Sequence, residues 1–194
     1  MKSYSQAGQD AFVCYILGEI GYGTYLEVGA GDPIEGNNTY SLEKMNWTGV
    51  SLELDSEKVE KFRSVRTNDI IMCDSTTFDW DSIKLPRVVD YLTFDVDEAA
   101  LPTFERFPFD KYEFKVITIE HDAYRFGIEP RNTMRRTLAN LGYQLICLDV
   151  RINGGIFEDW WVNPKYVDMA RAYDVACRGI EYSSIVELMS GAHR

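Results

Sequence analysis

The chain has 194 residues and a formal net charge of −11, from 20 basic and 31 acidic side chains. Its length suits one domain, which we expect to span residues 1–194, and its charge argues against nucleic acid or an anionic membrane as a partner, since both select basic surfaces. Because it has no long apolar run and no secretory leader, we expect a cytoplasmic protein whose four cysteines stay reduced.

Short apolar runs rich in β-branched and aromatic residues alternate with polar, helix-compatible stretches. Helices are expected after Ser56, a candidate N-cap, from about Glu98 to Arg106, and from Pro130 to Gly142. This alternation predicts an α/β sheet with right-handed crossovers. The six strand-like runs lie at residues 23–31, 50–55, 69–74, 88–97, 114–122 and 143–150.

The pattern changes after the sixth run. Asn153, Gly154 and Gly155 separate it from a further strand-like run at residues 157–164, and this tripeptide predicts a hairpin. The last strand is then antiparallel to its neighbour. A Rossmann-like, mostly parallel sheet of seven strands with one antiparallel strand is similar to the sheet of class I methyltransferases. A helix is expected at about 165–177.

The first run ends in a turn that carries Glu27, Gly29, Ala30 and Gly31. The glycines allow tight turning and close approach of a ligand to the backbone. Ile34 occupies the place of the third glycine in a dinucleotide fingerprint, which disfavours an NAD-binding domain. An acidic residue two places before the first glycine instead suits a cationic ligand such as S-adenosylmethionine (SAM). The alternative is an ordinary strand-to-loop glycine pair.

Acidic residues close the later runs as well. Glu53 lies at the end of the second run, where a carboxylate can accept hydrogen bonds from ribose hydroxyls. Asp74, next to Ser75, follows the third run and can reach the adenine amino group. Together these residues predict one electronegative rim along the sheet, formed by Asp32, Glu53 or Asp55, Asp74, Asp95 and Asp122.

Five motifs resemble the FkbM family of class I SAM-dependent methyltransferases: SQAGQD (5–10), YLEVGAGDP (25–33), NNTYSLE (37–43), WTGVSLELD (47–55) and VDYLTFDVDEA (89–99). The resemblance covers about residues 3–122 and implies methyl transfer, often to a hydroxyl of a sugar or a polyketide-like product. The family's fourth strand often closes as Asp-hydrophobic-Glu-Gly, and the glycine is missing from residues 95–99 here, so substrate contacts are not carried over at this loop. The implied SAM contacts are Gly29, Ala30, Gly31, Asn38, Glu53, Asp74 and Asp95.

Transfer of a methyl group to a hydroxyl requires that the acceptor lose its proton, which a base or a divalent cation assists. The candidate catalytic residues are His121, Asp95 and Asp97. Oxygen ligands with one imidazole favour Mg or Mn, and the candidate ligands are Asp95, Glu120, His121 and Asp122. Alternatively, Glu120 to Asp122 form a loop that only shapes the pocket.

Aromatic residues on the hairpin are candidates for stacking on a sugar ring. Trp160 and Trp161 alternate along a strand, so at most one faces a substrate, and core packing is the alternative for each. Tyr124 and Arg125 are further candidates for acceptor contacts. Near the N-terminus, Ser5 is expected to cap a helix that lies over the cofactor.

These features predict a SAM-dependent O-methyltransferase that acts on a hydroxyl of a sugar or glycan, with a divalent metal as a candidate aid to catalysis. A metal-independent methyltransferase with a different small-molecule acceptor shares every cofactor feature. So does a catalytically silent SAM-binding interaction module. Measuring the binding of SAM and of NAD identifies the cofactor, and measuring methylation of an acceptor distinguishes an enzyme from a silent binding module.

Overall fold

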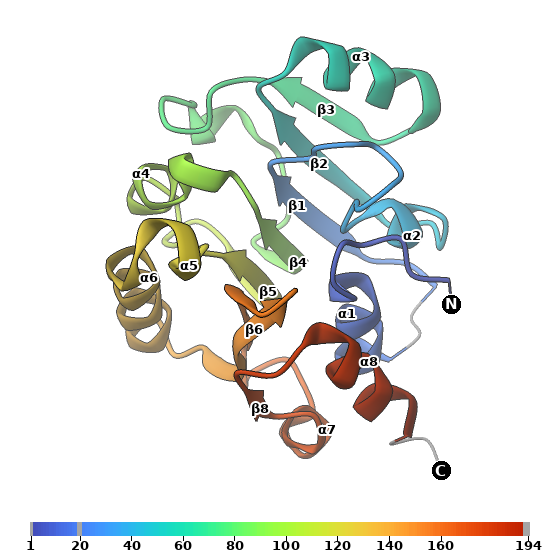
Figure 1. Cartoon of the computed structure of the whole chain (residues 1–194). Helices are drawn as coiled ribbons and strands as arrows, with labels where there is room; N and C mark the ends of the chain where they lie inside the picture. The colour runs from blue at the N-terminus through green and yellow to red at the C-terminus, as the bar shows by residue number, and fades with distance from the viewer. Residues whose placement is uncertain (1, 19–20, 192–194) are drawn as a thin grey trace.

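The computed structural model describes residues 2–18 and 21–191, which form one eight-stranded sheet with helices on both faces (Figure 1). The strand order is β3-β2-β1-β4-β5-β7-β6-β8. The strands are β1 (Thr24–Val28), β2 (Thr48–Glu53), β3 (Asp69–Met72), β4 (Val88–Phe94), β5 (Glu113–Glu120), β6 (Gln144–Ile152), β7 (Gly155–Val162) and β8 (Cys177–Arg178).

All seven predicted strands are present, and β7 alone runs antiparallel to its neighbours, β5 and β6. The turn between β6 and β7 consists of Asn153 and Gly154, whose φ angles are 51° and 82°. Two left-handed residues are what a type I′ hairpin requires, so the predicted hairpin is confirmed. The eighth strand was not predicted, because two residues beside the edge of β6 carry no periodic signal.

The helices differ from expectation mainly at their ends. Asp55, not Ser56, caps α3, and its side chain accepts from the Glu57 amide at 2.8 Å. α6 begins at Ile128, so Pro130 lies in its first turn, where the missing N–H costs no hydrogen bond. The α-helices are α1 (Gln9–Leu17), α2 (Tyr40–Glu43), α3 (Ser56–Val65), α4 (Ala100–Glu105), α5 (Ala123–Phe126), α6 (Ile128–Asn140), α7 (Met169–Asp174) and α8 (Tyr182–Gly191).

The N-terminal cap was predicted wrongly. Gly8 precedes α1, and Ser5 instead donates its hydroxyl to Asp10 at 2.6 Å. Asp10 also accepts from the Tyr4 amide, so it closes the N-terminal loop onto the helix. Ser5 pairs with Gly36 in an isolated bridge, which brings this loop against the segment that precedes α2.

The core has two main halves, one on each face of the sheet. On the face covered by α1 and α8, the ring of Phe12 packs against that of Trp160 at a centroid distance of 4.8 Å. On the other face, Trp161 joins a cluster that includes Phe94 and Phe114. Among the described residues no helix is long and apolar enough to cross a bilayer, and none of the four cysteines is in a disulfide bond.

Candidate functional site

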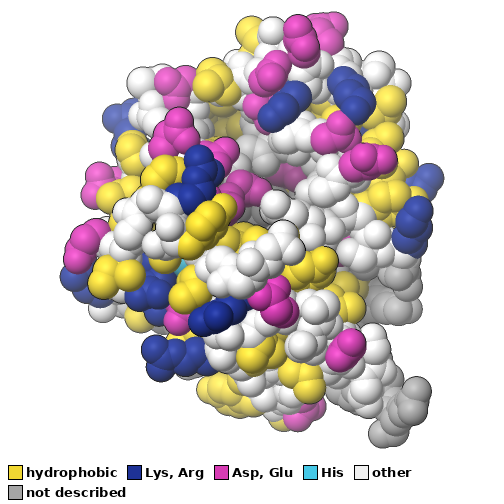
Figure 2. Space-filling model, viewed as in Figure 1, with side chains coloured by type: hydrophobic (Ala, Val, Ile, Leu, Met, Phe, Trp, Pro, Cys, Tyr) yellow, Lys and Arg dark blue, Asp and Glu magenta, His cyan; other side chains and the backbone are white. Residues whose placement is uncertain are grey.

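A cavity of about 430 Å³ opens where the parallel strands β1 to β4 end. Figure 2 shows Asp and Glu side chains around the recess in the upper half of this face. Seven carboxyl side chains and a single lysine, Lys58, line the cavity, so its field favours a cation. The carboxyl residues are Glu27, Asp32, Glu53, Asp74, Asp95, Asp97 and Glu98.

The turn after β1 forms the floor of the cavity. Gly29 has a φ of 90°, and a Cβ at this position would lie 1.6 Å from the carbonyl oxygen of Asp95. The loops after β1 and β4 therefore touch through their backbones, which only glycine permits. Gly31 also has a positive φ, of 60°, but nothing lies within 4 Å of its virtual Cβ. The glycine turn is where the sequence predicted it.

Glu53 ends β2 at the wall of the cavity. Its carboxylate accepts hydrogen bonds from the amides of Gly31 at 2.7 Å, Leu54 at 2.8 Å and Asp55 at 2.9 Å. These bonds fix both oxygens: Oε1 accepts two of them, and Oε2 accepts one and keeps a lone pair for a ligand. Asp74 and Ser75 also line the cavity, at the end of β3, as predicted.

Glu27 and Asn38 form the inner end of the cavity. Glu27 is 1% exposed and accepts from Ser51 Oγ at 2.6 Å and Thr39 Oγ1 at 3.1 Å. Burial raises the pKa of Glu27 to about 7. Asn38 donates its amide to Thr93 Oγ1 at 2.8 Å, while its Oδ1 is buried without a partner among the described residues. An unused acceptor beside a carboxyl group fits an ammonium ligand.

A buried arginine that the sequence did not single out holds this loop. Arg66 donates from Nη1 to Asn37 Oδ1 at 3.0 Å and to the carbonyl of Pro33 at 2.9 Å, and from Nε to Glu43 at 2.5 Å. Asn37 in turn donates to the carbonyl of Ala30 at 2.9 Å. Arg66 therefore positions the segment that carries Asn38. Its place at the end of α3 gave no sign of this role, because helices often end in a solvated arginine.

The ends of β4 and β5 bring further carboxyl groups together. Asp95 lines the cavity and shares a hydrogen bond with Glu120, and burial raises the pKa of both. Arg125, on α5, pairs with Asp97 at 2.5 Å and with Asp122 at 3.1 Å, which ties the β5 end to the cavity wall.

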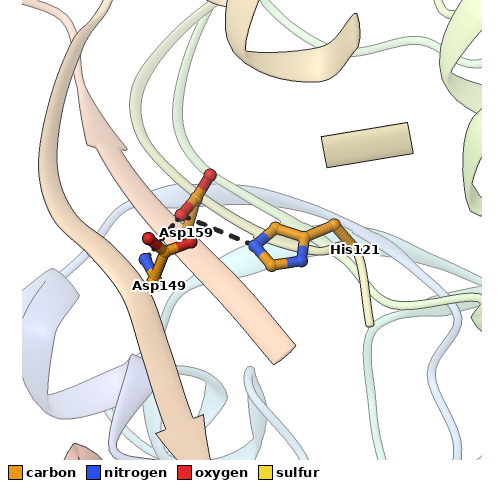
Figure 3. Close-up of side chains that lie close together, drawn as sticks. All are labelled: His121, Asp149 and Asp159. Carbon is orange, nitrogen blue, oxygen red and sulfur yellow. Dashed lines mark hydrogen bonds and ion pairs between the residues drawn. The ribbon is translucent and has the colours of Figure 1, made fainter. Parts of the chain in front are cut away.

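His121 does not join the predicted metal set. Its side chain is buried and turns toward Asp159, with Nε2 3.5 Å from Oδ1, as the dashed line in Figure 3 shows. Together with Asp149 these residues form the one group of three or more potential metal ligands found among the described residues. His121 is also absent from the cavity wall, so the prediction that it acts there as a base fails on geometry.

Arginines already fill the space that a cation would take in that group. Arg135 binds Asp159 through two bonds of 2.7 and 2.6 Å and reaches Asp149 at 2.7 Å. Arg131 adds a further bond to Asp149 at 2.7 Å. Two guanidinium groups neutralise the two carboxylates, so these residues do not fit Mg or Mn. The predicted set of Asp95, Glu120, His121 and Asp122 does not converge on one point either.

The tryptophan prediction is wrong for a different reason. Trp160 and Trp161 face opposite sides of the sheet, as expected, but both are core residues with 0% and 2% of their surface exposed. Helices cover both faces of β7, so neither ring reaches a ligand. Tyr124 is 58% exposed on α5, and Arg125 next to it is partly exposed. These two remain candidates for acceptor contacts.

Comparisons with known proteins agree with the topology. No family model matches the sequence, and no curated protein does. Among solved structures, a TehB-like SAM-dependent methyltransferase from Corynebacterium glutamicum matches 82% of this chain and 89% of its own, with a TM-score of 0.56 and 13% identity. A protein from Staphylococcus aureus, provisionally described as a caffeoyl-CoA O-methyltransferase, matches 84% and 85%, with a TM-score of 0.57 and 9% identity.

A third match is a dimethyladenosine transferase from Plasmodium falciparum, with a TM-score of 0.50, 12% identity, and coverage of 88% of this chain and 65% of that one. At these identities the likeness concerns the fold alone. The chain has the Rossmann-like α/β fold of class I methyltransferases, with the β6–β7 hairpin typical of it.

Proposed function

We propose that this chain is a SAM-dependent O-methyltransferase of the FkbM type that acts on a hydroxyl of a sugar or glycan. The observation that carries the proposal is the cavity beside the glycine turn, with seven carboxyl groups, one lysine and the unpartnered Oδ1 of Asn38. A dinucleotide brings a diphosphate, which this lining repels. SAM brings an ammonium and a sulfonium, which it attracts.

Each group of cavity residues suits a different part of SAM. Glu27 and Asn38 suit the ammonium end, because one is a buried carboxyl group and the other an unused acceptor. Glu53 suits the ribose hydroxyls, since its oxygens are held in place by three backbone amides. Asp74 and Ser75 stand where the adenine would lie. When bound, SAM supplies an electrophilic methyl group on sulfur.

Asp95 is the residue in this proposal that takes the acceptor proton. It lies on the cavity wall, and burial raises its pKa toward the range in which a carboxylate is a useful base. Asp97, on the same loop, is held by Arg125, so it shapes the entrance rather than the reaction. No step requires a metal, because the candidate ligands do not fit one.

Two measurements test the proposal. Calorimetry should detect binding of SAM, but not of NAD, to the wild-type protein. In Glu53→Ala, which lacks a charged hydrogen-bond acceptor, SAM affinity should fall about 10- to 100-fold. Absence of SAM binding at millimolar concentration would end the proposal. Incubation with SAM and a panel of sugars, read by mass, should show one added methyl group. Binding without any methyl transfer would indicate a silent SAM-binding module instead.

A further inference from the structure

Arginines collect near β6 and β8, at the side of the sheet farthest from β3, whereas the cofactor cavity lies over β1 to β4. Figure 2 shows Lys and Arg side chains in the lower left part of the face that carries the recess. Most of these arginines have a carboxylate partner, as Arg131 and Arg135 do. Arg151, near the end of β6, is different. Its Nε is buried without a hydrogen-bond partner among the described residues, and no ion pair of its guanidinium is found there.

The residues around Arg151 leave its charge largely uncompensated. A Cβ at Gly179 would lie 4.0 Å from Arg151 Nε, so the backbone that follows Arg178 passes beside the Arg151 side chain. Arg178 is 77% exposed, with its Nε 3.7 Å from Asp149 Oδ2. Glu181 is the nearby carboxylate, and its Oε1 accepts from the Gly154 amide at 2.7 Å. The exposed Arg178 and the partly buried Arg151 therefore add two positive charges here, beside Asp149, which two other arginines already bind, and Glu181, which the turn uses.

This arginine pair lies on the acceptor side of the candidate site. The ladder between β5 and β7 ends at the pair Glu120 and Glu158. Because β7 begins three residues before Glu158, the hairpin extends about 10 Å beyond the end of β5. The ring of Tyr124 lies 3.3 Å from a virtual Cβ at Gly155, in the hairpin itself. The hairpin that carries Arg151 thus stands beside exposed Tyr124 and the loop that Arg125 ties to the cavity wall.

We propose that Arg151 and Arg178 bind a phosphate group of the acceptor, which makes the acceptor a phosphorylated sugar. The inference rests on the proposed methyltransferase function and names its substrate class. A planar guanidinium binds phosphate through paired N–H donors, and a guanidinium without a partner has these donors free. In a chain of charge −11, an anionic acceptor needs such a local positive patch to overcome the general repulsion.

The methyl transfer itself is unchanged by this binding. The hydroxyl oxygen of the sugar forms the new bond to carbon, the sulfur–carbon bond breaks, its electron pair stays on sulfur, and the hydroxyl proton passes to Asp95. The phosphate only anchors the molecule at a distance from the reacting hydroxyl. Tyr124 offers a ring face to the sugar between the two ends.

The first experiment measures binding of inorganic phosphate and of glucose 6-phosphate by calorimetry to the wild type and to Arg151→Gln, Arg178→Gln and Arg136→Gln. Arg136 is the matched control, since it is an exposed arginine on α6 that bonds only Thr133 of its own helix. We expect at least a 10-fold loss of affinity in Arg151→Gln, a smaller loss in Arg178→Gln and no change in Arg136→Gln. Equal phosphate affinity in the wild type and Arg151→Gln would overturn the inference.

The second experiment compares methylation of glucose 6-phosphate and glucose. We expect the phosphorylated sugar to be preferred by the wild type and the preference to vanish in Arg151→Gln, while SAM affinity stays the same. Equal rates with both sugars would refute the inference and leave the methyltransferase proposal standing. Failure to bind SAM would refute the methyltransferase proposal and, with it, the assignment of a methyl acceptor, whereas phosphate affinity at Arg151 is measured without SAM and is judged separately. Thermal melting of each variant checks that it is folded.

Discussion

Substitution of Glu27 by Gln gives the sharpest test of how the cavity binds its ligand. Burial raises the pKa of Glu27 from 4.5 to about 7, so this carboxyl group is about half protonated at pH 7. A cation bound in the cavity favours the ionised form. Binding of SAM should therefore release about half a proton at pH 7 from this residue, and Glu27→Gln, which keeps the shape and cannot titrate, should release none.

The magnitude follows from the same pKa. At pH 6 about one Glu27 in ten is ionised, and at pH 8 about nine in ten are, so SAM affinity should rise roughly 10-fold between these values. SAM's own amino group titrates alike in both proteins, so the difference between wild type and Glu27→Gln isolates this residue. Calorimetry in buffers of different ionisation enthalpy counts the protons. Equal proton release by both proteins would refute the reasoning.

The same carboxyl group links folding to pH. The unfolded chain loses this proton at about 4.5 and the folded chain at about 7, so the folded state binds more protons in between. Stability therefore falls as pH rises through this window, by about 3 kcal/mol at most, at roughly 1.4 kcal/mol per pH unit. Urea unfolding from pH 4.5 to 8 should show this decline in the wild type and a shallower one in Glu27→Gln.

Three further predictions concern the turn, the core and the metal. Gly29→Ala should abolish SAM binding and lower the free energy of unfolding by several kcal/mol, because its Cβ would meet the Asp95 carbonyl. Gly31→Ala, with open space around its Cβ, should lower the free energy of unfolding by only about 1 kcal/mol. Urea unfolding and calorimetry check both variants. Trp160→Phe breaks a 2.7 Å bond to a buried carboxyl group and should cost about 1–3 kcal/mol more than Trp161→Phe, whose Nε1 has no partner among the described residues; equal urea midpoints would contradict this. Addition of EDTA should leave the initial rate of methyl transfer unchanged, and a loss restored by Mg or Mn would show that a metal takes part.

Much of the fold, and the part of the cavity proposed to bind SAM, could be predicted because the sequence patterns that indicate them are local. Alternation of apolar runs located seven strands, and Asn153 with Gly154 located the hairpin, since a two-residue turn depends on those residues alone. Gly29 and Glu53 stand at strand ends, and parallel strands end at one edge of the sheet. Their proximity therefore follows from the topology, without knowledge of any side-chain direction.

The acceptor side could not be predicted, because side-chain direction there depends on distant residues. His121 does not line the cavity: its Nε2 lies 3.5 Å from Asp159, on a strand that follows much later in the chain. The next residue, Asp122, has a left-handed φ of 42°, which reverses the chain in a way that no strand pattern indicates. Likewise, Trp160 is buried only because α1 covers that face of the sheet.

The insertion of β7 between β5 and β6 also constrains the order in which the chain can fold. β5 and β6 share no ladder of their own, so the sheet cannot close until β7 has been synthesised. Gln9 of α1 donates at 3.0 Å to Glu158, 149 positions later, and Phe12 packs on Trp160. The docking surface of α1, which also includes β5, is therefore incomplete until nearly the last strand emerges. We expect slow folding, with α1 docking late and the edge of β5 open to mispairing until then.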